Sequence, residues 1–140
     1  MKNETLSYIL RRINLSKCTY LRDGLYYIKT EVKQKVYNSE LQKERIRYIP
    51  CEFIIVTENN IKKSIIHKCD FNDLHWYTFI EWRNKGVLSN ALRSGIIKEC
   101  WPEIQSITCQ YEWNENKVEK YRKTEHLASL AGLTMRETFK

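Results

Sequence analysis

The chain has 140 residues, of which 42% are hydrophobic and 12% are aromatic, so it is long enough to form one globular domain with its own core. No apolar run approaches the roughly 20 residues that a membrane-spanning helix needs, and the N-terminus lacks the pattern of a signal peptide. These features argue against a membrane protein and predict a soluble, cytoplasmic one.

The net charge of +7 is distributed unevenly along the chain. Residues 1–50 have a net charge of +6, residues 51–82 have −2, and residues 83–140 have +3. A basic surface attracts polyanions, so nucleic acid or a phosphate-rich cofactor is an expected partner. The same charge is also compatible with a role in solubility alone.

The cysteines and histidines do not have the spacing of a metal site. The five cysteines are odd in number and contain no C-x-x-C pair, so neither a zinc site nor a disulfide framework is predicted. The three histidines lie on different predicted elements and have no i, i+4 spacing. We therefore expect reduced thiols and no bound metal. The residues concerned are Cys18, Cys51, Cys69, Cys100, Cys109, His67, His75 and His126.

The first part of the chain, residues 1–49, is predicted to be basic and mainly helical. A helix is expected over "NETLSYILRR", because Asn3 can cap it and apolar residues recur at helical spacing. The next stretch is ambiguous, since "LYYIKTEV" also fits a strand. The residues that follow are rich in helix formers, so we favour a helix to about residue 46.

Three strands of a meander are predicted after this part. "CEFIIVT" is β-branched and aromatic, "ENN" is a turn, and "IKKSIIHKC" continues as the partner strand of a hairpin. "DFND" is a second turn, and "LHWYTFIEW" is the third strand.

The C-terminal half is predicted to alternate helices and strands. Apolar residues from 86 to 100 form one face of a helix, and "SITCQYEW" alternates as a strand. "NENKVEKYRKTEHLASLA" is a helix that Gly132 ends in the αL conformation, and "LTMRETF" is a last strand. The order indicates a single mixed α/β domain, with a mostly antiparallel sheet flanked by helices.

The segment "RNKGVLSNAL" has the features of a phosphate site. A strand that ends in a glycine turn and opens a helix leaves the first helical amides unsatisfied, and these amides bind anions. Arg83 and Lys85 precede the helix, Gly86 forms the turn, and Ser89 lies in the first helical turn. The segment therefore predicts a phosphate-binding loop.

This segment resembles the acetyl-CoA pyrophosphate loop of the GNAT superfamily of N-acetyltransferases. That loop has the pattern Arg/Gln-x-x-Gly-x-Gly/Ala, as in "HPEYRGKGIGSALL", and the sequence here is "FIEWRNKGVLSNAL". The order of elements extends the resemblance from about residue 50 to the end, including "HLASLAGL", which is similar to the family's "lYeklGF" ending. The resemblance covers roughly two thirds of the chain and implies the GNAT-like acyl-CoA N-acyltransferase fold. The residues that match the loop are Glu81, Trp82, Arg83, Lys85, Gly86, Ser89, Ala91 and Leu92.

The resemblance implies acetyl transfer from acetyl-CoA to an amine. Backbone amides from Lys85 to Ser89 would hold the pyrophosphate, and Arg83 and Lys85 would add charge. Backbone groups of Phe79 and Ile80 would pair with the pantetheine. The implied cofactor-binding residues are Phe79, Ile80, Arg83, Asn84, Lys85, Gly86, Val87, Leu88 and Ser89.

Direct attack by the amine would need a general base and a general acid. By their positions, Glu81 or His75 is the candidate base, and Tyr111 or Tyr121 is the candidate acid. The expected partner is an amine acceptor, and the basic surface would suit one that is associated with nucleic acid. A homodimer is also compatible with these features.

Two other functions fit the sequence. "RKTEHLASLAGLTMRETFK" is similar to a helix-turn-helix, with Ala128 in the first helix and Gly132 in the turn, so the chain could bind nucleic acid through this segment and its basic N-terminal third. Alternatively, the chain is a degenerate GNAT-fold binding protein. Leu88 stands where the family has its second glycine, and Ala128 stands where it often has a tyrosine acid.

Overall fold

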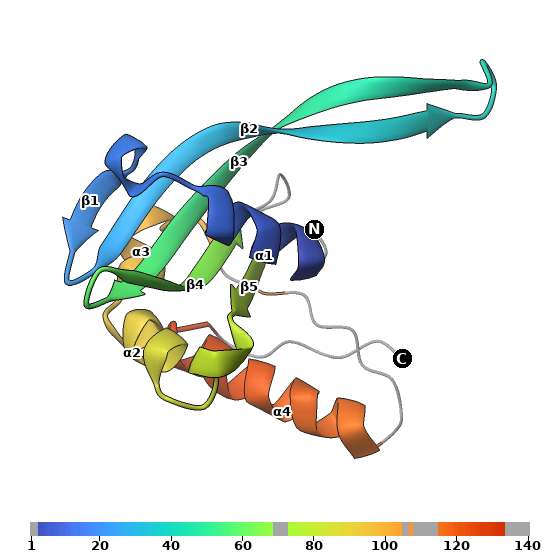
Figure 1. Cartoon of the computed structure of the whole chain (residues 1–140). Coiled ribbons are helices and arrows are strands. Elements are labelled where there is room, and N and C mark those ends of the chain that lie inside the picture. Colours follow the sequence, from blue (N-terminus) through green and yellow to red (C-terminus); the bar gives the residue numbers. More distant parts are fainter. Residues whose placement is uncertain (1–2, 69–72, 105–106, 108–114, 134–140) are drawn as a thin grey trace.

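The computed structural model describes residues 3–68, 73–104, 107 and 115–133. Its centre is an antiparallel sheet in which each strand pairs with the next one along the chain (Figure 1). The strands are β1 (Thr19–Arg22), β2 (Leu25–Asn38), β3 (Lys43–Glu58), β4 (Ile61–Lys68) and β5 (Leu74–Thr78).

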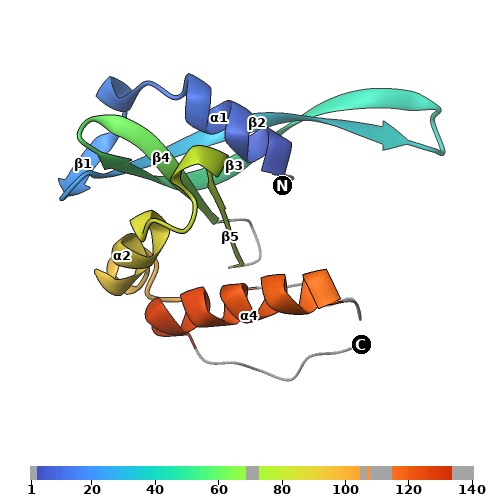
Figure 2. The same ribbon diagram turned by 60° about the horizontal axis from the view of Figure 1, so that its bottom comes forward.

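Helices cover both faces of this sheet. α1 lies on one face, and the helices that follow β5 lie on the other, as Figure 2 shows from below. The α-helices are α1 (Asn3–Arg12), α2 (Val87–Arg93), α3 (Ile96–Cys100) and α4 (Glu115–Leu130), and the 3₁₀ helices are η1 (Leu15–Lys17) and η2 (Ile80–Trp82). The fold is therefore α+β: a five-stranded antiparallel open sheet with four α-helices packed against it.

The two faces of the sheet have separate cores. Leu6 and Leu10 of α1 pack on Phe53 and its neighbours, whereas α2, α3 and α4 cover the opposite face around Ile54 and Ile66. This arrangement explains the continuous apolar run in β3, because a strand that is covered on both faces needs no polar alternation. The three predicted strands are confirmed over residues 51–58, 61–68 and 74–78, but the third was predicted to reach Trp82 and instead ends at Thr78, before η2.

Two-residue turns connect the strand pairs β1–β2 and β3–β4. Asn59 and Asn60 both have positive φ, between the paired residues Glu58 and Ile61, which is the type I′ geometry that matches strand twist. This confirms the predicted hairpin. A second turn at 23–24 has the same positive-φ geometry and connects β1 to β2. Asp-Gly is a strong hairpin signal, so this turn could have been predicted from the sequence.

The predicted helix to about residue 46 is wrong, and with it the mainly helical character of residues 1–49. Those residues form α1, β1, β2 and the first part of β3. Ile28, Val32 and Val36 are spaced by four, which satisfies the helical period and also the two-residue period of a strand. Pairing with β3 along the whole of β2 decides between the two.

The helices after β5 follow the predicted pattern with one change. The helix predicted over 86–100 is divided at Gly95, whose φ of 80° ends α2 and begins α3. α4 ends as predicted: Gly132 has positive φ, and the amide of Leu133 donates to the carbonyl of Ala128 at 3.0 Å, which is a Schellman motif.

Three predicted elements lie wholly or almost wholly on residues that the structure does not describe. The strand predicted over 106–113 lies almost wholly outside the described residues, and so do the last strand and the second helix of the helix-turn-helix. Within the described part of the chain, no helix is long and apolar enough to cross a membrane.

Candidate functional site

The outer halves of β2 and β3 extend beyond the body of the protein as a two-stranded ribbon, residues 31–50 (Figures 1 and 2). Nearly all of its side chains are exposed, in contrast to the buried inner half of β3. The strands pair in one uninterrupted register from Leu25 with Val56 to Asn38 with Lys43. Because no bulge interrupts this register, residues that face each other across the strands share one face of the ribbon.

One face of the ribbon is cationic. It is continuous with the α1 side of the sheet, since the same alternation leads inward to Phe53 under α1. Its cross-strand pairs are Gln34 with Arg47, Val36 with Arg45, and Asn38 with Lys43. We call these six residues the cationic face.

The charges of the cationic face are not neutralised by their neighbours. Among the residues that the structure describes, the side chains of Lys43, Arg45 and Arg47 form no ion pair or hydrogen bond. The carboxylates Glu31 and Glu44 alternate to the opposite face. Three exposed cations in a row therefore produce a positive surface that is free to attract an anion.

The opposite face of the ribbon combines aromatic, aliphatic and charged side chains. Its pairs are Lys33 with Tyr48, Lys35 with Ile46, and Tyr37 with Glu44. We call these six residues the tyrosine face. Tyr37 is 63% exposed and Tyr48 is 60% exposed, although both are large enough to be expected in a core.

A polar network fixes the base of the ribbon to the body. The carboxylate of Glu52 in β3 accepts hydrogen bonds from the Tyr27 hydroxyl at 2.5 Å and from Trp101 Nε1 at 3.2 Å, and it forms an ion pair with Lys68 at 3.2 Å. Lys68 also contacts Glu103 at 2.7 Å. The network joins β2, β3, β4 and the segment after α3 at the point where the ribbon leaves the sheet.

The network changes the pKa values of its members. Burial acts to raise the pKa of Glu52, but the hydrogen bonds from Tyr27, Trp101 and Lys68 outweigh it, so the pKa is lowered. Burial and the bond to Glu52 raise the pKa of Tyr27. The hydrogen bond to Glu103 raises the pKa of Lys68 against the effect of burial. Glu52, Glu103 and Lys68 are thus charged together at neutral pH, and Tyr27 stays a neutral donor.

The predicted cofactor residues extend from the end of β5 through η2 and the turn at residues 83–86 into the first turn of α2. Phe79 and Ile80 do not continue β5: the amide of Phe79 donates to the carbonyl of Lys63 at 3.0 Å, and the carbonyl of Ile80 accepts from the amide of Arg83 at the end of η2.

Gly86 has a φ of 79° and precedes α2, and its carbonyl accepts from the amide of Asn90 at 2.9 Å. Val87 and Leu88 are buried in the core under α2, and Leu88 is only 8% exposed. Its side chain therefore points into the protein and not toward solvent beside the glycine.

The charged residues of this turn have other contacts. Arg83 donates from Nε to the carbonyl of Thr78 at 2.9 Å, and its guanidinium lies 5.3 Å from the centre of the Tyr77 ring. Lys85 lies 5.2 Å from the centre of the Trp82 ring. Arg83 and Lys85 are nevertheless exposed, so part of their donor capacity faces solvent. These cations fix the shape of the turn and remain accessible to an anion.

The predicted catalytic groups do not assemble in the described residues. Glu81 is exposed in η2, next to the turn. His75 pairs with His67 on the α1 side of the sheet, opposite to α2. Burial lowers the pKa of His75, the N-terminal ammonium adds to this effect, and Asp73 opposes it. The side chain of Tyr121 and the whole of Tyr111 lie outside what the structure describes.

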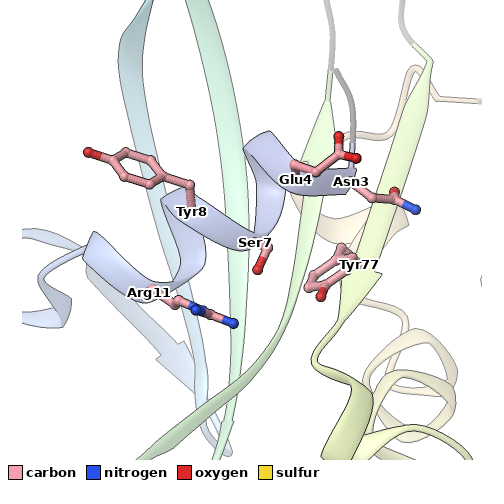
Figure 3. Close-up of a pocket in the computed structure, with 6 residues that line it drawn as sticks. All are labelled: Asn3, Glu4, Ser7, Tyr8, Arg11 and Tyr77. Atoms are coloured by element: carbon pink, nitrogen blue, oxygen red, sulfur yellow. The ribbon is translucent and has the colours of Figure 1, made fainter.

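An open groove of about 310 Å³ lies between α1 and β5 (Figure 3). Ser7 lies between Arg11 and Tyr77 in this view, and Tyr8 points away from them. The guanidinium of Arg11 packs over the Phe79 ring at 5.4 Å. The residues that line the groove are Asn3, Glu4, Ser7, Tyr8, Arg11 and Tyr77. Because Glu4 is negative and Arg11 is positive, the groove does not favour either an anionic or a cationic ligand.

The ribbon is not predicted from the sequence, because a helix is favoured over the residues that form β2 and the start of β3. The positive charge of residues 1–50 was the available signal, and Asp23-Gly24 marked the hairpin that brings β2 into the sheet.

Within the described part of the chain, no group of three His, Cys, Asp or Glu could hold a metal ion. No family model, curated protein or solved structure matches the chain.

Proposed function

We propose that this protein binds nucleic acid and that the cationic face of the ribbon is its main contact surface. The observation that supports this is the row of Lys43, Arg45 and Arg47, which are exposed, project from the body and have no carboxylate on their own face. A two-stranded β-ribbon is an established shape for entering a nucleic-acid groove.

The energetic basis of this proposal is counterion release. Each Lys or Arg that contacts a phosphate displaces condensed cations, so the logarithm of the binding constant falls with the logarithm of salt concentration, with a slope of about −0.9 per phosphate on duplex DNA. Three ribbon cations that neutralise phosphate charge, either by contacting phosphates or by lying between them in a groove, would contribute roughly 2.7 to the magnitude of this slope. Binding should therefore be strong at low salt and should weaken steeply as salt rises.

Neutralising the cationic face is expected to weaken binding by about 30- to 100-fold near physiological salt. The variant is Lys43→Gln/Arg45→Gln/Arg47→Gln, which keeps the length and polarity of the side chains. Fluorescence anisotropy with a labelled duplex of mixed sequence, repeated at several salt concentrations, measures both the affinity and the salt slope. The slope of the variant should be smaller in magnitude by about 3.

A charge-matched variant separates a ribbon contact from a general effect of net charge. Lys17→Gln/Arg93→Gln/Lys123→Gln removes the same charge from exposed positions on η1, α2 and α4. It should change the affinity by less than about fivefold, since long-range charge is screened within roughly 8–10 Å. An equal loss in both triple variants would contradict the proposed contact surface. The C-terminal helix-turn-helix stays a prediction, because its second helix falls on residues 134–140.

Acetyl-CoA binding at the turn between β5 and α2 is the second candidate function. It is supported by the contiguity of Arg83, Lys85 and Gly86, by the αL conformation of Gly86 before α2, and by the burial of Leu88, which keeps that side chain off the exposed side of the turn. The GNAT-like fold and transfer of the acetyl group to an amine remain part of this proposal. The catalytic base would be Glu81.

Arg83→Glu is expected to weaken acetyl-CoA binding by about tenfold or more, because it replaces a cation near the pyrophosphate with a like charge. Isothermal titration with acetyl-CoA measures the affinity, and Arg93→Glu, at the other end of α2, is the control. The absence of heat with the unmodified protein would exclude the cofactor. Binding without release of the CoA thiol across a panel of amines would indicate the degenerate, partner-binding protein.

A further inference from the structure

We infer that the cationic face of the ribbon lies in the major groove of duplex DNA and reads base edges there. This inference rests on the proposed nucleic-acid binding and specifies its ligand: double-stranded DNA with a preferred short sequence. The inference depends on the chemical identity of the side chains that share the cationic face, and not only on their charge.

The side chains of the cationic face match the hydrogen-bonding pattern of the major groove. Arg and Lys pair with the O6 and N7 acceptors of guanine, Gln pairs with the N6 donor and N7 acceptor of adenine, and an apolar side chain contacts the methyl group of thymine. Arg45, Arg47 and Lys43 supply the first kind of contact, Gln34 the second, and Val36 the third. A surface that bound only phosphates would need cations and would have no use for Gln34 and Val36, which lie on β2 opposite Arg47 and Arg45.

These side chains are available for such contacts. The side chains of Gln34, Lys43, Arg45 and Arg47 are exposed and have no hydrogen-bond or ion-pair partner among the described residues. Asn38 differs, because its Oδ1 accepts from the amides of residues 40 and 41 at 3.0 and 3.4 Å and so holds the turn at the tip. Four polar groups are therefore displayed on a scaffold whose register is fixed from base to tip.

The dimensions of the ribbon agree with the groove. A major groove about 12 Å wide admits two paired strands. Successive side-chain pairs on one face are about 7 Å apart, which corresponds to about two base pairs of B-DNA at 3.4 Å per step. The pairs Gln34–Arg47, Val36–Arg45 and Asn38–Lys43 would then span about four to six base pairs.

The tyrosine face fits this groove less well. Glu44 would approach the negatively charged groove, and Tyr37 and Tyr48 lack the paired donor and acceptor geometry of Gln or Arg. Two-sided contact is also excluded by geometry, because the floor of the groove can meet only one face of a ribbon. The cationic face is therefore the one that points toward the bases.

The test uses the full chain and a pool of duplexes with a random 20-base-pair core. Repeated selection by the unmodified protein should enrich a motif of about four to six base pairs that contains guanine. Arg45→Gln and Arg47→Gln should each relax the preference at one or two adjacent positions by about tenfold. Methylation of guanine N7, which lies in the major groove, should interfere with binding at those same positions.

Lys33→Gln and Lys35→Gln are the matched controls, because each removes one charge from the opposite face of the same ribbon. They should reduce the salt slope by at most about one and should leave the enriched motif unchanged. The duplex should also bind at least tenfold more tightly than single-stranded DNA or RNA of the selected sequence.

Other outcomes overturn the inference and are distinguishable from failure of the proposed function. Salt-dependent binding that is lost in the triple ribbon variant but enriches no motif leaves nucleic-acid binding intact and excludes base reading. Tighter binding to single strands, or interference only from minor-groove ligands, excludes the major groove. No binding to any nucleic acid excludes both proposals and would leave the ribbon as a surface for a protein partner.

Discussion

Gly24→Ala is expected to lower the free energy of unfolding by about 3–4 kcal/mol. Gly24 has a φ of 78°, and the Cβ of an alanine there would overlap the backbone carbonyl oxygen of Thr57. That carbonyl belongs to β3, and Thr57 also donates to the carbonyl of Gly24 from its amide at 2.8 Å and from its hydroxyl at 2.9 Å. Because both partners are backbone atoms held in the sheet, the overlap cannot be relieved by a rotamer change.

Gly95→Ala is the matched control, since Gly95 has nearly the same φ of 80° but no heavy atom within 4 Å of an added Cβ. It should therefore show the cost of the left-handed backbone alone, about 1–2 kcal/mol. Urea denaturation followed by circular dichroism measures both variants. Similar losses in the two variants would mean that the β1–β2 turn can move away from Thr57, and would contradict the close contact.

The elements that could be predicted from the sequence are those with one dominant local signal. The run "CEFIIVT" is rich in β-branched and aromatic residues, and α4 is a run of helix formers that ends at a glycine C-cap, Gly132. β2 has no such signal, because it is exposed on both faces in the ribbon and contains Lys, Glu and Gln, which also favour helices. Its structure depends on pairing with β3, and a long-range pairing cannot be read from a local window.

The same limit applies to the candidate sites. The turn around Gly86 could be predicted because its residues are neighbours in the sequence. The cationic face could not, since Gln34 and Arg47 meet only through the register of two strands. His75 shows the reverse case, in which residues close in sequence are not close in space. It is a candidate base because it lies near the turn in the sequence, but strand alternation directs it to the other face of the sheet.

Glu52→Ala is expected to lower the free energy of unfolding by about 3 kcal/mol at pH 7. The substitution would remove the common acceptor of Tyr27 and Trp101 and the ion-pair partner of Lys68, and would leave partly buried donors unsatisfied. Glu44→Ala is the control on the same strand and the same face, where the carboxylate is exposed and has no partner in the described residues. It should change the stability by less than about 0.5 kcal/mol.

The pH dependence of the free energy of unfolding is a second test of the role of Glu52. The folded pKa of Glu52 is lowered, so its contribution is complete above the ordinary glutamate value of 4.5 and is lost as pH falls through the folded pKa. The folded pKa of Lys68 is raised, so its contribution is complete below its ordinary value of 10.5 and is lost above it. The stabilities of the unmodified protein and of Glu52→Gln in urea denaturation should therefore differ most between these values, and the difference should shrink as the pH falls below 4.5. A difference that stayed constant with pH would mean that the carboxylate contributes by packing, and that charge does not hold the ribbon to the sheet.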